Sequence, residues 1–159
     1  MIAARGRQRI VILGGGSGGV VAATHLGRRL GASHEIVLID RRREHVYMPG
    51  FIFLMVGERR PGDLTRPLQR LARHHVDVRQ AVVEGIDPAR QEVFTSEGRV
   101  PYDHLIIALG LETVPTAIPG FAEAAHHPWE LGATLRLQAA LAEFERGHIL
   151  LGVPPGPYR

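Results

Sequence analysis

The sequence lacks cysteine and lysine altogether. Without cysteine, the chain can form neither a disulfide framework nor a metal site with thiolate ligands. All 19 Lys or Arg positions are arginine, and a net charge of +3 with only 6% aromatic residues does not favour nucleic-acid binding. No apolar run reaches the length of a membrane-spanning helix. A basic stretch at residues 5–9 precedes apolar residues, as in a signal peptide, but glycines interrupt that run, so we expect a cytoplasmic protein.

Glycine, in contrast, is concentrated in one place, with five glycines among the six residues 14–19. The apolar run Ile10–Leu13 precedes them, a helical pattern follows over residues 20–30, and a second apolar run over residues 35–39 comes next. This order of strand, turn, helix and parallel strand is typical of a dinucleotide-binding fold. The 159 residues, 45% of them apolar, suffice for one globular domain.

The motif G-x-G-x-x-G falls on Gly14, Gly16 and Gly19. The first glycine would allow a tight turn, the second would let the backbone approach a pyrophosphate, and the third would let helix and strand pack closely. The N-terminus of the helix presents free N–H groups and a partial positive charge. We therefore predict that these glycines, together with Ser17 and Gly18, hold a pyrophosphate.

Asp40 ends the second apolar run, 21 residues after Gly19, where a carboxylate can accept both hydroxyls of an adenosine ribose. Three arginines follow it, beginning with Arg41. They could bind a 2′-phosphate, as in NADP enzymes, or form a solvated loop whose backbone covers the adenine. Because Asp40 would repel a 2′-phosphate, we favour the second interpretation, which counts Arg41 among the cofactor-binding residues.

The remaining pattern predicts a mixture of helices and short strands. The apolar segment 47–57 contains a Pro49-Gly50 turn and a short buried helix or loop at 51–56, which could fill the core or face a ligand. Adjacent His74 and His75 do not share a helix face, so we predict no metal site. The other expected elements are a helix from Asp63 or Thr65 to about His74, an antiparallel meander from an extended segment at 76–83 with strands at 92–95 and 99–102, a fully buried strand at 105–109, a proline-broken connection at 113–120, a helix at 128–146 and a strand at 148–153.

A second motif resembles one found in a known superfamily. Residues 102–110 read YDHLIIALG and follow the predicted meander. With the glycine motif, this order resembles the glutathione-reductase-like flavoproteins, in which a motif ending in A-T-G returns to the flavin; here Leu109 replaces the usual Thr or Ser. The resemblance implies FAD as the cofactor, with Ala108 and Gly110 close to it, the backbone of Val83 at the adenine and Pro49 toward the flavin.

Within that superfamily, the segment HVYMPGFIFLMVG at 45–57 is similar to sulfide:quinone oxidoreductases and flavocytochrome c sulfide dehydrogenases. At residues 152–157 the sequence GVPPGP stands where NADH-using relatives have a second glycine motif, and prolines lack the N–H donors of a phosphate-binding turn. In the sulfide-oxidising proteins, such a turn leads to a Cys-Pro-Pro region with a redox cysteine.

The expected architecture is an α/β, Rossmann-like FAD-binding domain, incomplete relative to the family. Residues 1–127 would form its first part, 128–147 a connecting helix and 148–159 the first strand of a second dinucleotide-type domain. No catalytic residue is assigned, and the isolated chain is expected to be inactive, since sulfide oxidation through FAD to quinone or a cytochrome needs the absent cysteines. The alternatives are a type II NADH dehydrogenase, or a non-enzymatic fragment that binds nucleotide or self-associates through an exposed sheet edge. A full-length form could also bind peripherally to a membrane.

Overall fold

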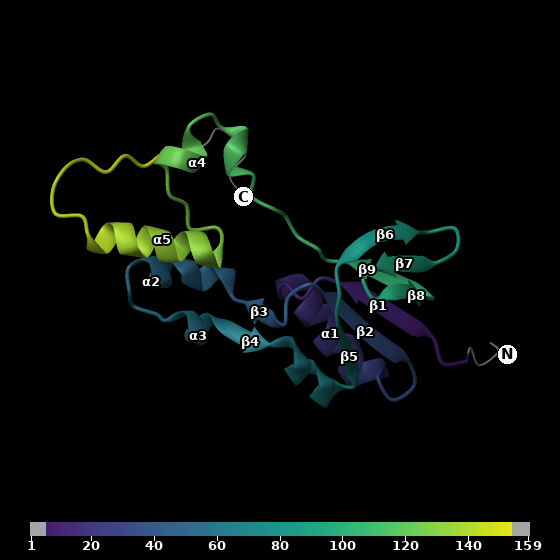
Figure 1. Cartoon of the computed structure of the whole chain (residues 1–159). Coiled ribbons are helices and arrows are strands. Elements are labelled where there is room, and N and C mark those ends of the chain that lie inside the picture. The colour runs from purple at the N-terminus through teal and green to yellow at the C-terminus, as the bar shows by residue number, and fades with distance from the viewer. Residues whose placement is uncertain (1–5, 154–159) are drawn as a thin grey trace.

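The computed structural model describes residues 6–153 (Figure 1). Its longer elements alternate between strand and helix from β1 to β5, and a run of short strands follows. The strands are β1 Arg9–Leu13, β2 Glu35–Asp40, β3 Glu44–Val46, β4 Thr65–Pro67, β5 Val76–Gln80, β6 Val83–Asp87, β7 Glu92–Thr95, β8 Gly98–Pro101 and β9 His104–Ile107. The helices are α1 Ser17–Leu30, α2 Phe51–Met55, α3 Pro61–Leu64, α4 Phe121–Ala124 and α5 Leu131–Ala142, with 3₁₀ turns η1 Met48–Gly50, η2 Leu68–His74 and η3 Pro115–Ala117.

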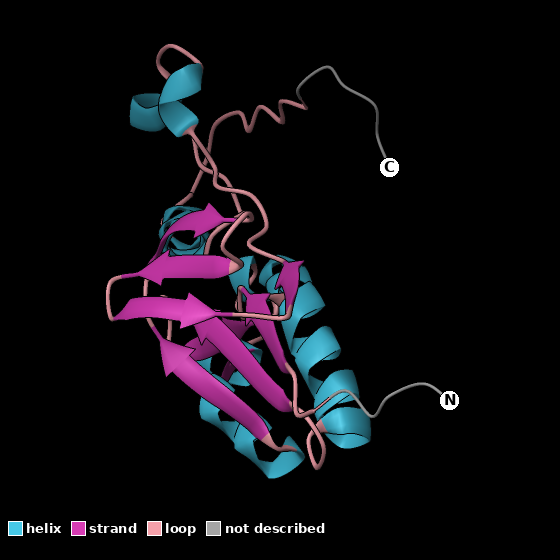
Figure 2. Cartoon of the chain, turned by 90° about the vertical axis from the view of Figure 1, so that its right-hand side faces the viewer, coloured by secondary structure: helices cyan, strands magenta, loops and turns pink. Residues whose placement is uncertain are grey.

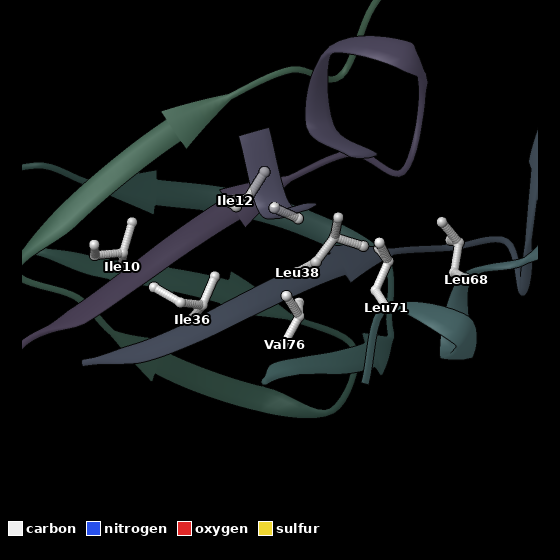
Figure 3. Close-up of a cluster of buried hydrophobic side chains, with 8 residues drawn as sticks. Ile10, Ile12, Ile36, Leu38, Leu68, Leu71 and Val76 are labelled. Carbon is white, nitrogen blue, oxygen red and sulfur yellow. The ribbon is translucent and has the colours of Figure 1, made fainter. Parts of the chain in front are cut away.

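A four-stranded parallel sheet in the order β5-β2-β1-β9 forms the centre of the fold. Its two inner strands are almost continuous apolar runs because both of their faces are covered. On one face, alternate residues of β1 and β2 pack with α1 and η2, and Figure 3 shows this cluster: Ile10, Ile12, Ile36, Leu38, Leu68, Leu71 and Val76. The intervening residues pack on the other face against the antiparallel sheet β6-β7-β8 through a second cluster: Val11, Leu13, Val37, Ile39, Ala81, Val93 and Val100. The predicted Rossmann-like α/β fold with a meander is thus confirmed (Figure 2).

Helix α1 packs on the sheet through its small residues. The buried positions are Gly19, Ala23 and Gly27, spaced four residues apart on one face. A side chain at Gly27 would collide with the carbonyl oxygen of His74 at the end of η2, so the glycine permits this close approach. The helix begins at Ser17 rather than at residue 20, since Gly16 is already its N-cap.

The segment expected to be one helix from residue 63 or 65 to 74 is instead three short elements. Helix α3 ends at Leu64, strand β4 pairs antiparallel with β3, and the 3₁₀ turn η2 follows. Pro67 gives the reason, because proline lacks the N–H that a continuous α-helix needs at this position. The prediction of a single helix was therefore wrong.

The extended segment predicted at residues 76–83 is also divided. Strand β5 joins β2 in the parallel sheet, and β6 starts the meander after a break at Ala81, whose N–H donates to the carbonyl oxygen of Asp40 at 3.0 Å. The prediction of one meander strand at 76–83 was therefore wrong, because β5 and β6 belong to two different sheets. Residues 88–91 form the turn that leads into β7.

Strand β9 pairs only with β1 and lies at one edge of the described parallel sheet. The prediction of a fully buried strand at 105–109 was wrong, since Ile107 is 61% exposed and Leu109, which follows the strand, is 54% exposed. The apolar composition of this segment misled the prediction, because an apolar run shows that a strand is suited to burial but not whether a neighbour covers it.

After β9, the described chain leaves the parallel sheet and passes through η3 and α4. It then forms α5, which lies beside α2 (Figure 1). The side-chain amide of Gln138 donates to the carbonyl oxygen of Leu54 at 2.8 Å, and Leu131 packs on the cluster of Phe51, Leu54 and Leu64. The predicted helix at 128–146 is confirmed only in its central part, residues 131–142. Residues 148–153, expected to be a strand, have no regular secondary structure, and Pro154–Arg159 lie outside the described residues.

Candidate functional site

The glycine turn between β1 and α1 has the geometry that its sequence predicts. Gly14 has a φ of +101°, which favours glycine, and a side chain there would collide with the carbonyl oxygen of Ala108. A side chain at Gly19 would collide with the carbonyl oxygen of Gly14. A Cβ at Gly16, in contrast, would meet no atom within 4 Å. The first and third glycines are therefore required by the packing of the chain on itself, whereas Gly16 faces open space where a ligand can approach.

The N-terminus of α1 is suited to an anion. Its first turn carries no acidic residue, and its last turn carries Arg28 and Arg29, so the charged side chains match the helix dipole. The N-cap Gly16 has no side chain that could satisfy the first N–H groups of the helix, which include those of Ser17 and Gly18. These are the groups that hold phosphates in dinucleotide-binding turns.

Asp40 is fixed in place at the end of β2. Its Oδ2 accepts the N–H of Gly15 at 2.5 Å, and its Oδ1 accepts the N–H of Arg42 at 2.6 Å. Each carboxylate oxygen can accept a further hydrogen bond, so a ribose diol could still bind. Two charge-assisted bonds to the backbone thus orient the acid beside the glycine turn.

The second motif, residues 102–110, meets the first one in space. The N–H of Ala108 donates to the carbonyl oxygen of Leu13 at 2.8 Å, directly before the glycine turn. The Ala108 methyl group would be 3.8 Å from a Cβ at Gly18, and Gly110 follows with a φ of +77°. Two motifs that are about ninety residues apart in the sequence therefore form adjacent walls of one site at the carboxyl ends of β1 and β9.

Three other residues predicted to bind the cofactor lie in the segments after β2 and at the start of β6. Arg41 is exposed; its guanidinium lies 4.0 Å from Glu112, and its carbonyl oxygen accepts the amide of Gln80 at 3.3 Å. Val83 begins β6 opposite Thr95. Pro49 lies exposed in η1. The cofactor roles of these three residues remain predictions.

Two residues that contact the glycine turn, His45 and Leu68, were not predicted from the sequence. The Nδ1–H of His45 on β3 donates to the carbonyl oxygen of Gly15 at 3.0 Å. The side chain of Leu68, which starts η2, fills the space beside Gly15, with a methyl group only 2.5 Å from where a Cβ would be. Neither residue carries a local signal, because the β3–β4 pair that brings them there joins segments about twenty residues apart.

A parallel sheet with a glycine turn at a helix N-terminus and an acid ending the second strand defines a dinucleotide-binding protein of the Rossmann type. The model of the pyridine nucleotide-disulphide oxidoreductase family matches residues 8–149, so the chain belongs to this family. Within residues 6–153, no cluster of three or more potential metal ligands is present, and no helix has the length and apolar character needed to cross a membrane.

Three known proteins illustrate the similarity. Demethylphylloquinone reductase NdbB of Synechocystis is 35% identical over 126 residues, covering 74% of this chain and 31% of that protein. A type II NADH:quinone oxidoreductase of Haemophilus influenzae is 28% identical over 131 residues, covering 73% and 30%. The solved sulfide:quinone oxidoreductase of Aquifex aeolicus superposes with a TM-score of 0.77 at 31% identity, covering 86% of this chain and 32% of that one. This chain thus spans about a third of the length of these relatives.

Proposed function

We propose that this chain is the FAD-binding N-terminal portion of a flavoprotein oxidoreductase of the sulfide:quinone oxidoreductase kind. The observation that carries the proposal is the meeting of the two motifs at Ala108 and Gly14, since the superfamily in which both occur together uses FAD. The space above Gly16, the N-terminus of α1 and the oriented Asp40 carboxylate fit a pyrophosphate joined to a ribose.

In this assignment, each part of the site has a separate task. The N–H groups of residues 16–19 bind the pyrophosphate, Asp40 binds the ribose hydroxyls, and the backbone near Val83 and Arg41 covers the adenine. Ala108, Gly110 and Pro49 lie toward the flavin. The flavin, when bound, supplies a carrier of two electrons. The chain itself binds and orients the cofactor, and because it has no cysteine, it contributes no thiol to sulfide oxidation.

The test is a titration of the 159-residue chain with FAD, followed by the flavin fluorescence. Gly16→Val should abolish or greatly weaken binding, because its side chain fills the space that the pyrophosphate needs. Gly62→Val is the matched control, since Gly62 on α3 also has open space around it and lies outside the glycine turn. A wild-type chain that does not respond to FAD, or two variants that bind equally well, would reject the proposal.

The second candidate is the type II NADH dehydrogenase activity, which the similarity to the Haemophilus influenzae enzyme supports. The two candidates differ in their electron donor. In the complete protein, bleaching of the flavin by sulfide and not by NADH supports the first candidate, and bleaching by NADH without sulfide supports the second. The prolines at 154, 155 and 157, in place of a second glycine motif, favour the first candidate.

The partners follow from the same proposal. A quinone or a cytochrome would accept the electrons in the complete protein, which would then work at a membrane surface. The exposed edge of β9, with Ile107 and Leu109, would pair with another copy of this chain when no further segment covers it. Sedimentation velocity should then show a dimer or larger species, and a monomer at all concentrations would contradict self-association.

A further inference from the structure

A second concave site lies between α1, β4 and η2, with a volume of about 350 Å³. Its floor is apolar and includes Val20, Leu68 and Leu71. Its basic lining residues are Arg28, Arg66, Arg70, Arg73, His45 and His74, and no acidic residue of the described chain lines it. We call this site the arginine groove. From Val20 to Arg28 it follows nine residues of α1, or about 12 Å at the helical rise.

Among the residues that the structure describes, no carboxylate pairs with the guanidinium groups of the arginine groove. Within the described residues, none of its four arginines forms an ion pair. Arg66 donates to the carbonyl oxygens of Gly62 and Thr65, at 3.0 and 2.6 Å. Arg28 and Arg70 make no side-chain hydrogen bond in the part of the chain that the structure describes. Several like charges therefore face one small volume, with donors still available.

His74 lies beside several positive charges of the arginine groove. Its partial burial and the neighbouring charges of Arg28, Arg73 and His75 lower its pKa from the usual 6.5. Its Nε2 accepts a hydrogen bond from the Nε–H of Arg73 at 3.1 Å, which requires that nitrogen to be unprotonated. Burial, the largest cause, disfavours charge of either sign, whereas the neighbouring charges of Arg28, Arg73 and His75 make the local potential positive, and a positive potential attracts an anion.

We propose that the arginine groove binds a compact, multiply charged phosphate anion. Guanidinium groups bind phosphate oxygens in a bidentate manner, and binding would relieve the repulsion between the arginines. The groove is concave and its volume is about 350 Å³, which suits a small soluble anion better than a flat membrane surface. The site does not depend on the proposed FAD function, because its arginines lie outside the glycine turn.

The arginine groove and the glycine turn share one contact. His45 lines the groove and donates through Nδ1 to the carbonyl oxygen of Gly15, while the N–H of Gly15 donates to Asp40. Val20 belongs to the first turns of α1 and also lines the groove. The end of the groove at Val20 and His45 therefore borders the glycine turn, on the side away from the proposed cofactor.

The test is a calorimetric titration of the 159-residue chain with tripolyphosphate at an ionic strength of about 0.1 M, which screens distant charges. The double variant Arg70→Gln/Arg73→Gln should bind roughly tenfold more weakly or not at all, since it loses charge-assisted bonds. The double variant Arg90→Gln/Arg136→Gln removes the same charge from the β6–β7 turn and α5, outside the groove, and should bind like the wild type. Circular dichroism of both variants checks that they are folded.

Two further measurements distinguish binding in the arginine groove from binding at the glycine turn or to a membrane surface. Gly16→Val alters the turn that is proposed to bind pyrophosphate, so tripolyphosphate binding that persists in Gly16→Val and is lost in Arg70→Gln/Arg73→Gln belongs to the arginine groove and not to the glycine turn. Cosedimentation with phosphatidylcholine vesicles containing phosphatidylserine tests the membrane alternative. No tripolyphosphate binding, equal binding by the two double variants, loss of binding in Gly16→Val, or binding only to the vesicles would each overturn the proposal.

Discussion

Gly19 offers a direct measure of how tightly α1 packs on the glycine turn. A Cβ at this position would collide with the carbonyl oxygen of Gly14 and would also lie 3.0 Å from the carbonyl carbon of the same residue. Both are backbone atoms, so no rotation of a side chain can relieve the contact. Gly19→Ala therefore forces α1 away from β1 or distorts the turn.

The neighbouring Gly18 provides the matched substitution. A Cβ at Gly18 would make only an ordinary contact with Ala108, at 3.8 Å. Alanine is favoured over glycine in a helix by about 1 kcal/mol, and both variants gain this term equally. The difference between them isolates the steric cost, which for overpacking is about 1–3 kcal/mol.

The assay is urea unfolding followed by circular dichroism at 222 nm. Gly18→Ala should be at least as stable as the wild type, and Gly19→Ala should have a lower midpoint, with an unchanged dependence of the unfolding free energy on urea. In a thermal melt, each kcal/mol corresponds to about 3 °C for a chain of this size. Equal stability of the two variants would refute the contact between Gly19 and Gly14.

Three other substitutions test contacts outside the motif. His45→Phe leaves the carbonyl oxygen of Gly15 without its partner and should lower the unfolding free energy by about 1 kcal/mol and weaken FAD binding, whereas His25→Phe on the exposed face of α1 should do neither. Gln138→Leu removes the donor to Leu54 and should cost about 1 kcal/mol, and an unchanged urea midpoint would show that this bond does not dock α5 on α2. Because the pKa of His74 is lowered in the folded chain, the unfolded chain binds more protons just below pH 6.5, and stability should fall as the pH falls through this range. His74→Gln should flatten that part of the stability profile measured between pH 5 and 7, and an unaltered slope would contradict the shift.

Much of the geometry of the candidate site could be predicted from the sequence because its signals are local. The glycine spacing specifies a turn that only glycine can form at Gly14, and the distance to Asp40 matches the length of a helix and a strand. The parallel strands were recognisable as apolar runs that both faces of a sheet can bury. The sequence pattern at 102–110 indicated a second wall of the site, and the structure brings it to the first.

The failures lie where distant segments decide the local structure. Residues 61–74 contain a helical spacing of leucines, yet Pro67 and the pairing with β3 divide them into the short helix α3, a strand and a 3₁₀ turn. Residues 76–83 have one extended pattern, but their two ends belong to different sheets. In both cases, the local propensity is weaker than the hydrogen bonds and burial that a partner strand provides.

The sequence by itself determined the dinucleotide turn, its acid and the absence of any thiol chemistry in this chain. Only the tertiary structure showed that His45 and Leu68 support the turn from behind and that the edge of β9 is exposed. It also gathered Arg28 with Arg66, Arg70 and Arg73 around one groove. The physical reason is that a turn depends on the dihedral angles of a few consecutive residues, whereas a hydrogen bond across strands or a cluster of charges depends on how separate segments pack.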